Sequence, residues 1–281
     1  MKTKLLLLLL TLITFSLKTQ TSLQMERKVV NTKIGQIAVF QKQVDFYKTP
    51  IIFLHGVYFD HHLWENQITA ISDRPVFALD MPLHGESKVN IKEKWNLDDC
   101  AEMLLEILDS LKIDKVIAIG HSWGSMTILR AAHKNPTKFA GVGLGNMPYK
   151  EATKTQKIII RLQQSGLMFK NFYIKQAGIA LMGKESRNKN HELMQKLITP
   201  MIKLSKKEIK YTNKAVRIDA RDATEMINKM KVPVIAFVGK DDYVGTPPVK
   251  ETTIVNGGHV SPIEVPEEVN IIIGKLTTLA D

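Results

Sequence analysis

The 281-residue sequence contains a single cysteine, Cys100, so no disulfide can form within one chain. An oxidising compartment would therefore give this protein no covalent cross-link. Cys100 lies within a helical pattern, where buried packing is its expected role. Metal-ligand patterns are also missing, because no cysteine or carboxylate spacing around the doublet His61 and His62 completes a recognised site. We therefore predict no bound metal and assign such histidines to surface or turn positions.

The sequence also has no apolar run long enough to cross a bilayer. The longest run covers residues 5–17, with lysines on both sides, and about 20 residues are needed for a membrane-spanning helix. Its length and flanking charges are typical of a signal peptide, although no small-x-small cleavage pattern follows it. We predict that residues 1–22 direct export to the periplasm or the exterior. An uncleaved N-terminal anchor is the alternative.

Acidic residues are scarce between positions 147 and 215. This segment has 15 lysines and arginines against 4 acids, so it accounts for the whole formal net charge of +11. The basic charge suits an anionic substrate or peripheral contact with an anionic membrane surface, but a solvated lysine-rich helix surface is the simpler interpretation. Nucleic-acid binding is not predicted, because no aromatic side chains alternate with the basic ones on a strand platform.

Strand and helix patterns alternate on either side of this basic segment. Short apolar runs at 50–54, 75–79, 116–119, 140–144 and 233–238 predict buried strands, and the leucine spacing over 96–111 predicts a helix. Residues 147–215 contain three helical patterns, with Gly183 and Pro200 as breaks, and no convincing strand. We predict an α/β fold with a mostly parallel sheet, helices on both faces, a core of residues 23–146 and 216–281, and a helical cap or lid at 147–215.

The sequence Gly120-His121-Ser122-Trp123-Gly124 follows the strand at 116–119 and precedes a helix predicted from about Ser125. This is a G-x-S-x-G nucleophile elbow in its strand-turn-helix context. Gly120 and Gly124 are needed there because strand and helix approach closely at such a sharp turn. The helix start directs free N–H groups toward any oxyanion formed nearby. Ser122 is the predicted nucleophile.

A serine nucleophile needs a base and an acid that orients the base. His259 follows the last predicted strand, after two glycines that let its loop fold toward the elbow. Asp242 follows the strand at 233–238 and is the preferred acid; Asp241 is the alternative. The order serine, aspartate, histidine is the one expected for an elbow on a central strand.

These motifs together resemble the α/β-hydrolase superfamily over residues 50–279. The resemblance is carried by IIFLHGV (51–57), ALDMPLHGES (78–87), IGHSWGS (119–125), PVIAFVGKDD (233–242) and GGHVSPIEVPEEVN (257–270). It implies a serine nucleophile at Ser122, a base at His259, an acid at Asp242, and an oxyanion hole formed by the backbone N–H groups of Val57 and Trp123. It also implies that the segment from Met147 is the variable cap.

The resemblance implies acyl transfer from a small ester, lactone or thioester, with no cofactor. A ligand-binding or receptor-like protein without turnover is the main alternative, and a cofactor-free perhydrolase or carbon–carbon bond hydrolase is another. Two features depart from the family. Leu83 stands where relatives usually have glycine, and only 11 residues separate Gly239 from Glu251, so the helix that usually joins these strands must be shortened or lost.

Overall fold

The computed structural model describes residues 25–44, 48–91, 94–189 and 191–281. The predicted signal peptide at 1–22 lies outside these residues. Within the described ranges, no helix is long and apolar enough to span a membrane.

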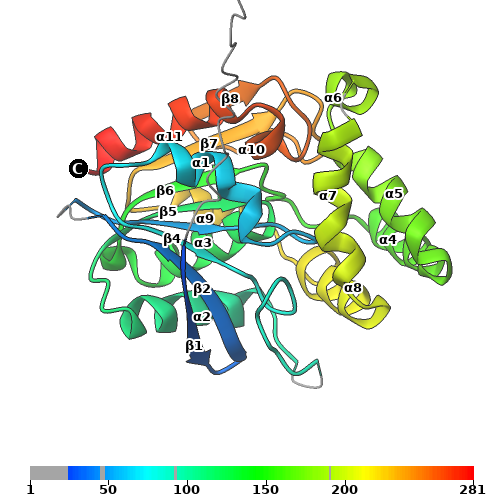
Figure 1. The fold of residues 1–281 in the computed structure, drawn as a ribbon, viewed down its shortest axis with the longest axis horizontal. Helices are drawn as coiled ribbons and strands as arrows, with labels where there is room; N and C mark the ends of the chain where they lie inside the picture. Colours follow the sequence, from blue (N-terminus) through cyan, green and yellow to red (C-terminus); the bar gives the residue numbers. More distant parts are fainter. Residues whose placement is uncertain (1–24, 45–47, 92–93, 190) are drawn as a thin grey trace, which may run out of the picture.

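An eight-stranded sheet forms the centre of the molecule (Figure 1). Its strands, in chain order, are β1 (Glu26–Thr32), β2 (Gly35–Lys42), β3 (Ile51–Leu54), β4 (Val76–Leu79), β5 (Val116–His121), β6 (Phe139–Gly145), β7 (Val234–Gly239) and β8 (Glu251–Val255). Their order across the sheet is β1-β2-β4-β3-β5-β6-β7-β8. The pairs β1–β2 and β2–β4 are antiparallel, and all remaining neighbours are parallel. The mostly parallel sheet predicted from the sequence is confirmed.

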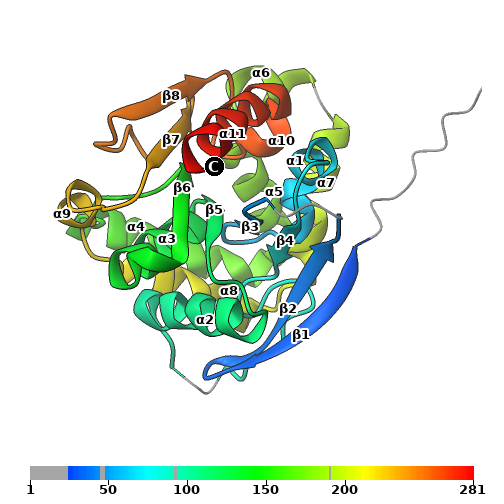
Figure 2. The ribbon, with the colours of Figure 1, turned by 90° about the vertical axis from the view of Figure 1, so that its left-hand side faces the viewer.

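Helices cover both faces of this sheet (Figures 1 and 2). One face is covered by α2 (Leu97–Ser110) and α3 (Trp123–Lys134); the other by α1 (Glu65–Ala70), α10 (Ser261–Glu264) and α11 (Pro266–Ala280). The central strands are buried on both sides, which explains their unbroken apolar runs. Asn96 caps α2, and Asp99 completes a capping box.

The chain between β6 and β7 is helical and lies at one end of the molecule (Figure 1). This helical insert comprises α4 (Lys154–Ser165), the 3₁₀ turn η3 (Gly166–Phe169), α5 (Lys170–Leu181), α6 (Lys184–Lys189), α7 (His191–Lys203), α8 (Lys206–Asn213) and the π-helical turn η4 (Lys214–Ile218). The predicted break at Pro200 is wrong, because α7 continues through it. A proline removes one backbone donor and usually bends a helix, yet here its neighbours keep helical geometry. The short helix α9 (Thr224–Asn228) follows the insert and precedes β7.

Two departures from the family have clear structural counterparts. Leu83 has a positive φ of 66°, the left-handed conformation that glycine adopts without cost, and its side chain is buried. The connection between β7 and β8 contains no helix, as the 11-residue spacing predicted, yet the strands are still parallel.

Candidate active site

Ser122 lies at the turn between β5 and α3. Its φ of 50° and ψ of −110° are strained for a residue with a side chain, and its N–H donates to the carbonyl of Gly145 on β6. A Cβ at Gly124 would overlap the carbonyl of Leu54, and one at Gly120 would overlap the backbone of Ser125. The close approach expected at these glycines is therefore present. Helix α3 begins at Trp123, two residues earlier than predicted.

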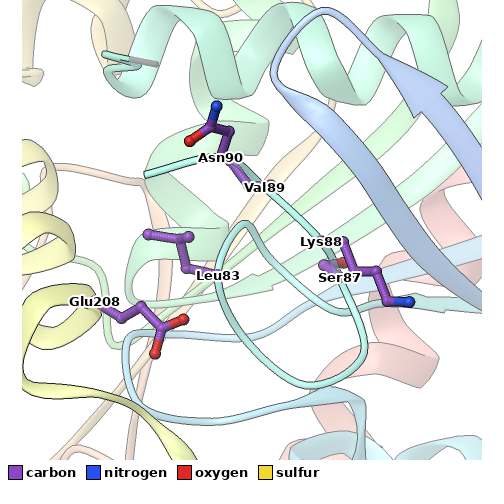
Figure 3. Close-up of a pocket in the computed structure, with 6 residues that line it drawn as sticks. All are labelled: Leu83, Ser87, Lys88, Val89, Asn90 and Glu208. Carbon is purple, nitrogen blue, oxygen red and sulfur yellow. The ribbon is translucent and has the colours of Figure 1, made fainter. Parts of the chain in front are cut away.

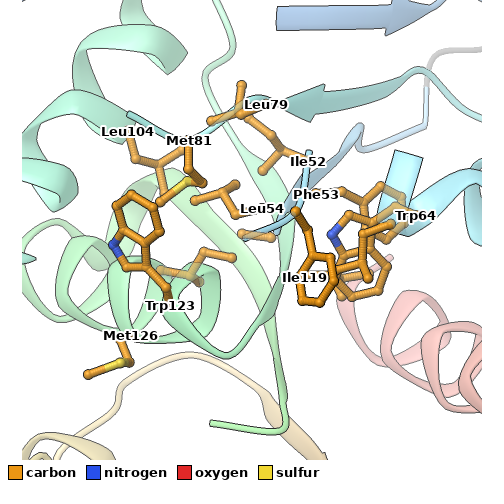
Figure 4. Close-up of a cluster of buried hydrophobic side chains, with 14 of the residues drawn as sticks. Ile52, Phe53, Leu54, Trp64, Leu79, Met81, Leu104, Ile119, Trp123 and Met126 are labelled. Carbon is orange, nitrogen blue, oxygen red and sulfur yellow. The ribbon is translucent and has the colours of Figure 1, made fainter. Parts of the chain in front are cut away.

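A cluster of buried hydrophobic side chains packs against the start of α3, directly after this turn (Figure 4). The Trp123 side chain is fully buried and stacks on Trp95 with ring centroids 5.4 Å apart. Figure 4 shows Trp123 close to Met81 and Leu104, on the side of β3 opposite Trp64. Burying an aromatic side chain of this size stabilises the fold by several kcal/mol, roughly 3–5 on truncation to alanine. The start of α3 is thus fixed by packing as well as by the turn.

The structure brings Ser122, His259 and Asp242 into one hydrogen-bonded row. The Ser122 Oγ atom lies 3.0 Å from His259 Nε2, and His259 Nδ1 lies 2.9 and 3.0 Å from the two carboxylate oxygens of Asp242. All three side chains are buried or nearly so. With Nδ1–H donating to Asp242, Nε2 is free to accept the serine proton. This arrangement can activate the hydroxyl for attack on a carbonyl carbon.

Asn146, at the end of β6, holds the carboxylate of Asp242 in place. Its amide Nδ2 donates to Asp242 Oδ2 at 2.7 Å and to the carbonyl of Gly258 at 3.1 Å, while its Oδ1 accepts from Ser261. Burial alone would raise the pKa of Asp242, but the nearby His259 and the Asn146 amide outweigh burial and lower it. Asp242 therefore stays ionised at neutral pH.

The alternative acid, Asp241, points elsewhere. Its Oδ2 accepts the backbone N–H of Lys184 in α6 at 2.8 Å, so it ties the β7–β8 loop to the insert. Of the two neighbouring carboxylates, only Asp242 contacts His259.

His259 itself is fixed by backbone contacts on both sides. Its N–H donates to the carbonyl of Leu181, the last residue of α5, at 2.8 Å. Its own carbonyl accepts from His121 Nε2 at 2.6 Å, and the Tyr243 ring stacks against its imidazole with centroids 4.8 Å apart. Burial lowers the pKa of His121 to about 3, so this residue donates as a neutral imidazole. The loop that carries His259 is thus held by both the core and the insert.

The backbone N–H groups of Val57 and Trp123 have no acceptor among the described residues. Trp123 is the first residue of α3, where N–H groups are free and the helix dipole is positive. Val57 follows Gly56, whose added Cβ would meet the His121 ring and Ser122 Cβ, so this loop passes directly beside the nucleophile. Both donors are available for an oxyanion next to Ser122.

Two buried histidines brace the loop that contains Val57, which the sequence analysis did not anticipate. His84 Nε2 accepts the Tyr58 N–H at 3.0 Å, and His55 Nε2 accepts the Met81 N–H at 2.8 Å. His55 lies in the loop after β3 and His84 in a bend after β4, and both are buried. Burial lowers the pKa of both histidines, to about 3 for His84. Each imidazole is therefore neutral, and its Nε2 carries no proton and can accept a hydrogen bond.

Asp60, His61 and His62 form a cluster whose possible ligand atoms lie within 4.8 Å of one another. Asp60 is a carboxylate directly beside the histidine doublet, although the sequence pattern did not indicate it. In the structure His61 Nδ1 contacts the buried Asp80 at 2.8 Å, and His62 Nδ1 contacts Asp60 at 3.0 Å. These hydrogen bonds explain why the three residues lie close together, because each histidine is paired with a carboxylate.

A surface hollow lies between the loop after β4 and the insert (Figure 3). It is lined by Leu83, Ser87, Lys88, Val89, Asn90 and Glu208. None of Ser122, Asp242 or His259 lines it, so it is separate from the hydrogen-bonded row.

The sheet order, the elbow and the buried Ser-His-Asp row define a protein of the α/β-hydrolase fold class. A profile of the alpha/beta hydrolase fold family matches residues 49–175. The structure superimposes on a thermophilic esterase from Thermogutta terrifontis with a TM-score of 0.79 at 18% identity, covering 91% of this chain and 100% of that one. It superimposes on an enol-lactonase from Burkholderia xenovorans with a TM-score of 0.79 at 16% identity, covering 89% and 100%. The chain therefore has the α/β-hydrolase fold, and residues 49–175 match the profile of that family.

Sequence relatives are distant. The chain is 24% identical over 238 residues to 3-oxoadipate enol-lactonase 1 from Acinetobacter baylyi, covering 78% of this chain and 84% of the lactonase. It is 36% identical over 97 residues to a dihydrolipoyllysine-residue acetyltransferase component from Pseudomonas putida. That match covers 34% of this chain and only 26% of the length of the acetyltransferase component.

Proposed function

We propose that this protein is a serine hydrolase that cleaves a small carboxylic ester or lactone through an acyl-enzyme. The observation that supports this most directly is the 3.0 Å contact between Ser122 Oγ and His259 Nε2, with Asp242 on the other imidazole nitrogen. The similarity to esterases and to enol-lactonases is consistent with it.

In this mechanism His259 takes the Ser122 proton as Oγ attacks the carbonyl carbon. The oxyanion accepts hydrogen bonds from the N–H groups of Val57 and Trp123, and the alkoxide leaves with the proton from His259. Water then attacks the acyl-enzyme, with His259 as base again, and releases the acid and Ser122. Asp242 orients the imidazole and stabilises its positive charge. The reaction needs no cofactor.

Covalent labelling with a fluorophosphonate probe tests this proposal. The wild type is expected to label stoichiometrically and to hydrolyse 4-nitrophenyl esters, and Ser122→Ala is expected to do neither. Ser125→Ala is the matched control, because the Ser125 hydroxyl donates to the Gly145 carbonyl and not to His259. A wild type that does not label, or a Ser122→Ala variant that labels equally, would favour the ligand-binding alternative.

A further inference from the structure

Arg217 lies in the π-helical turn η4 of the insert, beside the candidate active site. Its Nη1 donates to Asn213 Oδ1 at 3.3 Å, and Asn213 Nδ2 donates to the Tyr58 hydroxyl at 3.0 Å. Tyr58 is the residue after Val57, so the loop with the predicted oxyanion donor reaches this arginine through one tyrosine side chain. π-Helical turns are rare and are frequent at functional sites.

The surroundings of Arg217 contain phenols but no carboxylate. The Tyr58 hydroxyl lies 2.8 Å from that of Tyr173 on α5, and the electrostatic neighbours of Arg217 include the phenols of Tyr58, Tyr173 and Tyr243. No aspartate or glutamate in the described ranges forms an ion pair with Arg217, which is partly buried. Lys214 in the same turn, by contrast, is paired with Asp219. A partly buried guanidinium without a counter-ion is costly unless a ligand supplies the charge.

Tyr243 connects this arginine to the base. Its ring stacks on His259, and it is among the phenols around Arg217. Arg217 thus has two tyrosines as neighbours: Tyr58, which follows the predicted oxyanion donor Val57, and Tyr243, which stacks on His259.

We propose that Arg217 binds a carboxylate on the acyl portion of the substrate, so that the preferred substrates are hemiesters or lactones of short dicarboxylic acids. This rests on the proposed function and deepens it. A guanidinium binds a carboxylate through two parallel hydrogen bonds, and Arg217 has further N–H groups beyond the one that Asn213 accepts. The outer side of the same turn lines a basic hollow with Arg161, Lys207, Lys210 and Lys214, which raises the local concentration of anions.

The test compares two esters of equal chain length, mono-4-nitrophenyl glutarate and 4-nitrophenyl pentanoate. Arg217→Met is expected to lower kcat/KM for the glutarate hemiester by about 10- to 100-fold, mostly through KM, because a hydrogen-bonded charge contributes roughly 1.5–3 kcal/mol. The preference for the hemiester, the ratio of the two kcat/KM values, is therefore expected to fall by about the same factor, because the pentanoate has no carboxylate to bind. Arg161→Met removes one charge from the outer hollow and serves as the matched control. An unchanged preference between the esters in Arg217→Met would overturn the proposal.

Protection of Ser122 from the fluorophosphonate probe provides a second measurement that needs no turnover. Glutarate is expected to slow labelling of the wild type and of Arg161→Met but not of Arg217→Met. Equal protection of all three, or of none, contradicts the carboxylate site. Absence of labelling in the wild type would instead contradict the proposed function.

A separate observation concerns the outer surface of the insert. Several large apolar side chains of the insert are exposed, among them Leu162, Met168, Phe169, Phe172 and Ile202 at 48–73%. Lys206 donates to the carbonyl of Met168, and Lys170 donates to that of Ile202, so η3 and the end of α7 lie side by side. We call these five side chains the insert patch. Lys170 and Lys206 border the patch, and the insert carries 15 lysines and arginines against 4 acids. Exposed apolar groups gathered in this way mark interaction sites.

We propose that the insert patch docks on an anionic lipid surface. Apolar side chains bordered by lysines suit the boundary between acyl chains and negatively charged headgroups. Two copies of this chain joined through the patch would bring the basic side chains of both inserts together. Charge complementarity therefore favours the lipid surface over self-association.

Vesicle co-sedimentation of the full chain tests this docking. Binding is expected to vesicles of 70% phosphatidylcholine and 30% phosphatidylglycerol, to weaken with added salt, and to fall at least tenfold in the double variant Phe169→Ser/Phe172→Ser. Ile271→Ser, on the exposed side of α11, is the matched control. Equal binding by the double variant, no binding by the wild type, or a dimer that the double variant abolishes would each refute the docking surface.

Discussion

Acid should destabilise this protein through its buried histidines. His84 and His121 are buried, and burial lowers the pKa of each to about 3, whereas an unfolded chain has a histidine pKa near 6.5. Between these values the unfolded state binds more protons than the native state. The contribution of both residues is therefore complete above pH 6.5 and is lost as the pH falls toward 3.

The size of the effect follows from the pKa differences. Well inside this window each histidine changes the free energy of unfolding by about 1.4 kcal/mol per pH unit. Between pH 7 and pH 5 the unfolded histidines are only partly protonated at first, so each lowers it by about 2 kcal/mol and the pair by roughly 4 kcal/mol. Domains are typically stable by about 5–15 kcal/mol, so the loss is a large fraction of the total. His55, whose pKa is also lowered by burial, acts in the same direction.

Urea denaturation followed by tryptophan fluorescence at pH 7 and pH 5 measures this loss. His84→Asn is expected to reduce the pH dependence of the unfolding free energy by about 2 kcal/mol, and His133→Asn, at an exposed position, should leave it unchanged. Comparing pH dependences cancels the constant cost of the substitution. Identical pH dependence in the wild type and His84→Asn would show that burial does not hold this imidazole neutral.

Three further predictions concern the active site. Asp242→Asn should lower kcat on the order of 10³- to 10⁴-fold, whereas Asp241→Asn, which loses only a contact to α6, should retain most activity in the same ester assay. Asn146→Ala should lower kcat about tenfold with little change in KM, because the Asp242 carboxylate loses its amide donor; an unchanged kcat would remove Asn146 from any positioning role. Gly124→Ala should prevent stable folding, while Gly274→Ala, where a Cβ meets nothing within 4 Å, should be neutral or stabilising in thermal melts.

The sequence predicted the elements whose pattern is local. The apolar runs identified the central strands, and the G-x-S-x-G motif located Ser122 at a sharp turn. The glycines before His259 indicated a loop that folds back toward Ser122. The short β7–β8 spacing correctly predicted the loss of a helix. These features depend on periodicity and turn chemistry, which a single sequence displays directly.

Contacts between distant segments were not predictable in this way. Asn146 supports Asp242 across 96 residues, and His121 reaches the carbonyl of His259 across 138. No spacing rule encodes such pairs, and histidine burial has no periodic signal. Pro200 was misjudged for a related reason, because the tertiary packing of Leu197 and Met201 in α7 outweighs the local preference of proline to end a helix.

The attachment of the insert to the loop of His259 limits how the insert can move. Leu181 accepts the His259 N–H, Gly183 donates to Glu264, and Asp241 holds Lys184, so this corner of the insert is fastened to the catalytic loop itself. Swinging the corner open would pull the base away from Ser122. We therefore expect movement of the insert to be confined to helices away from its α5–α6 corner, where it leaves the hydrogen bond between Ser122 and His259 undisturbed.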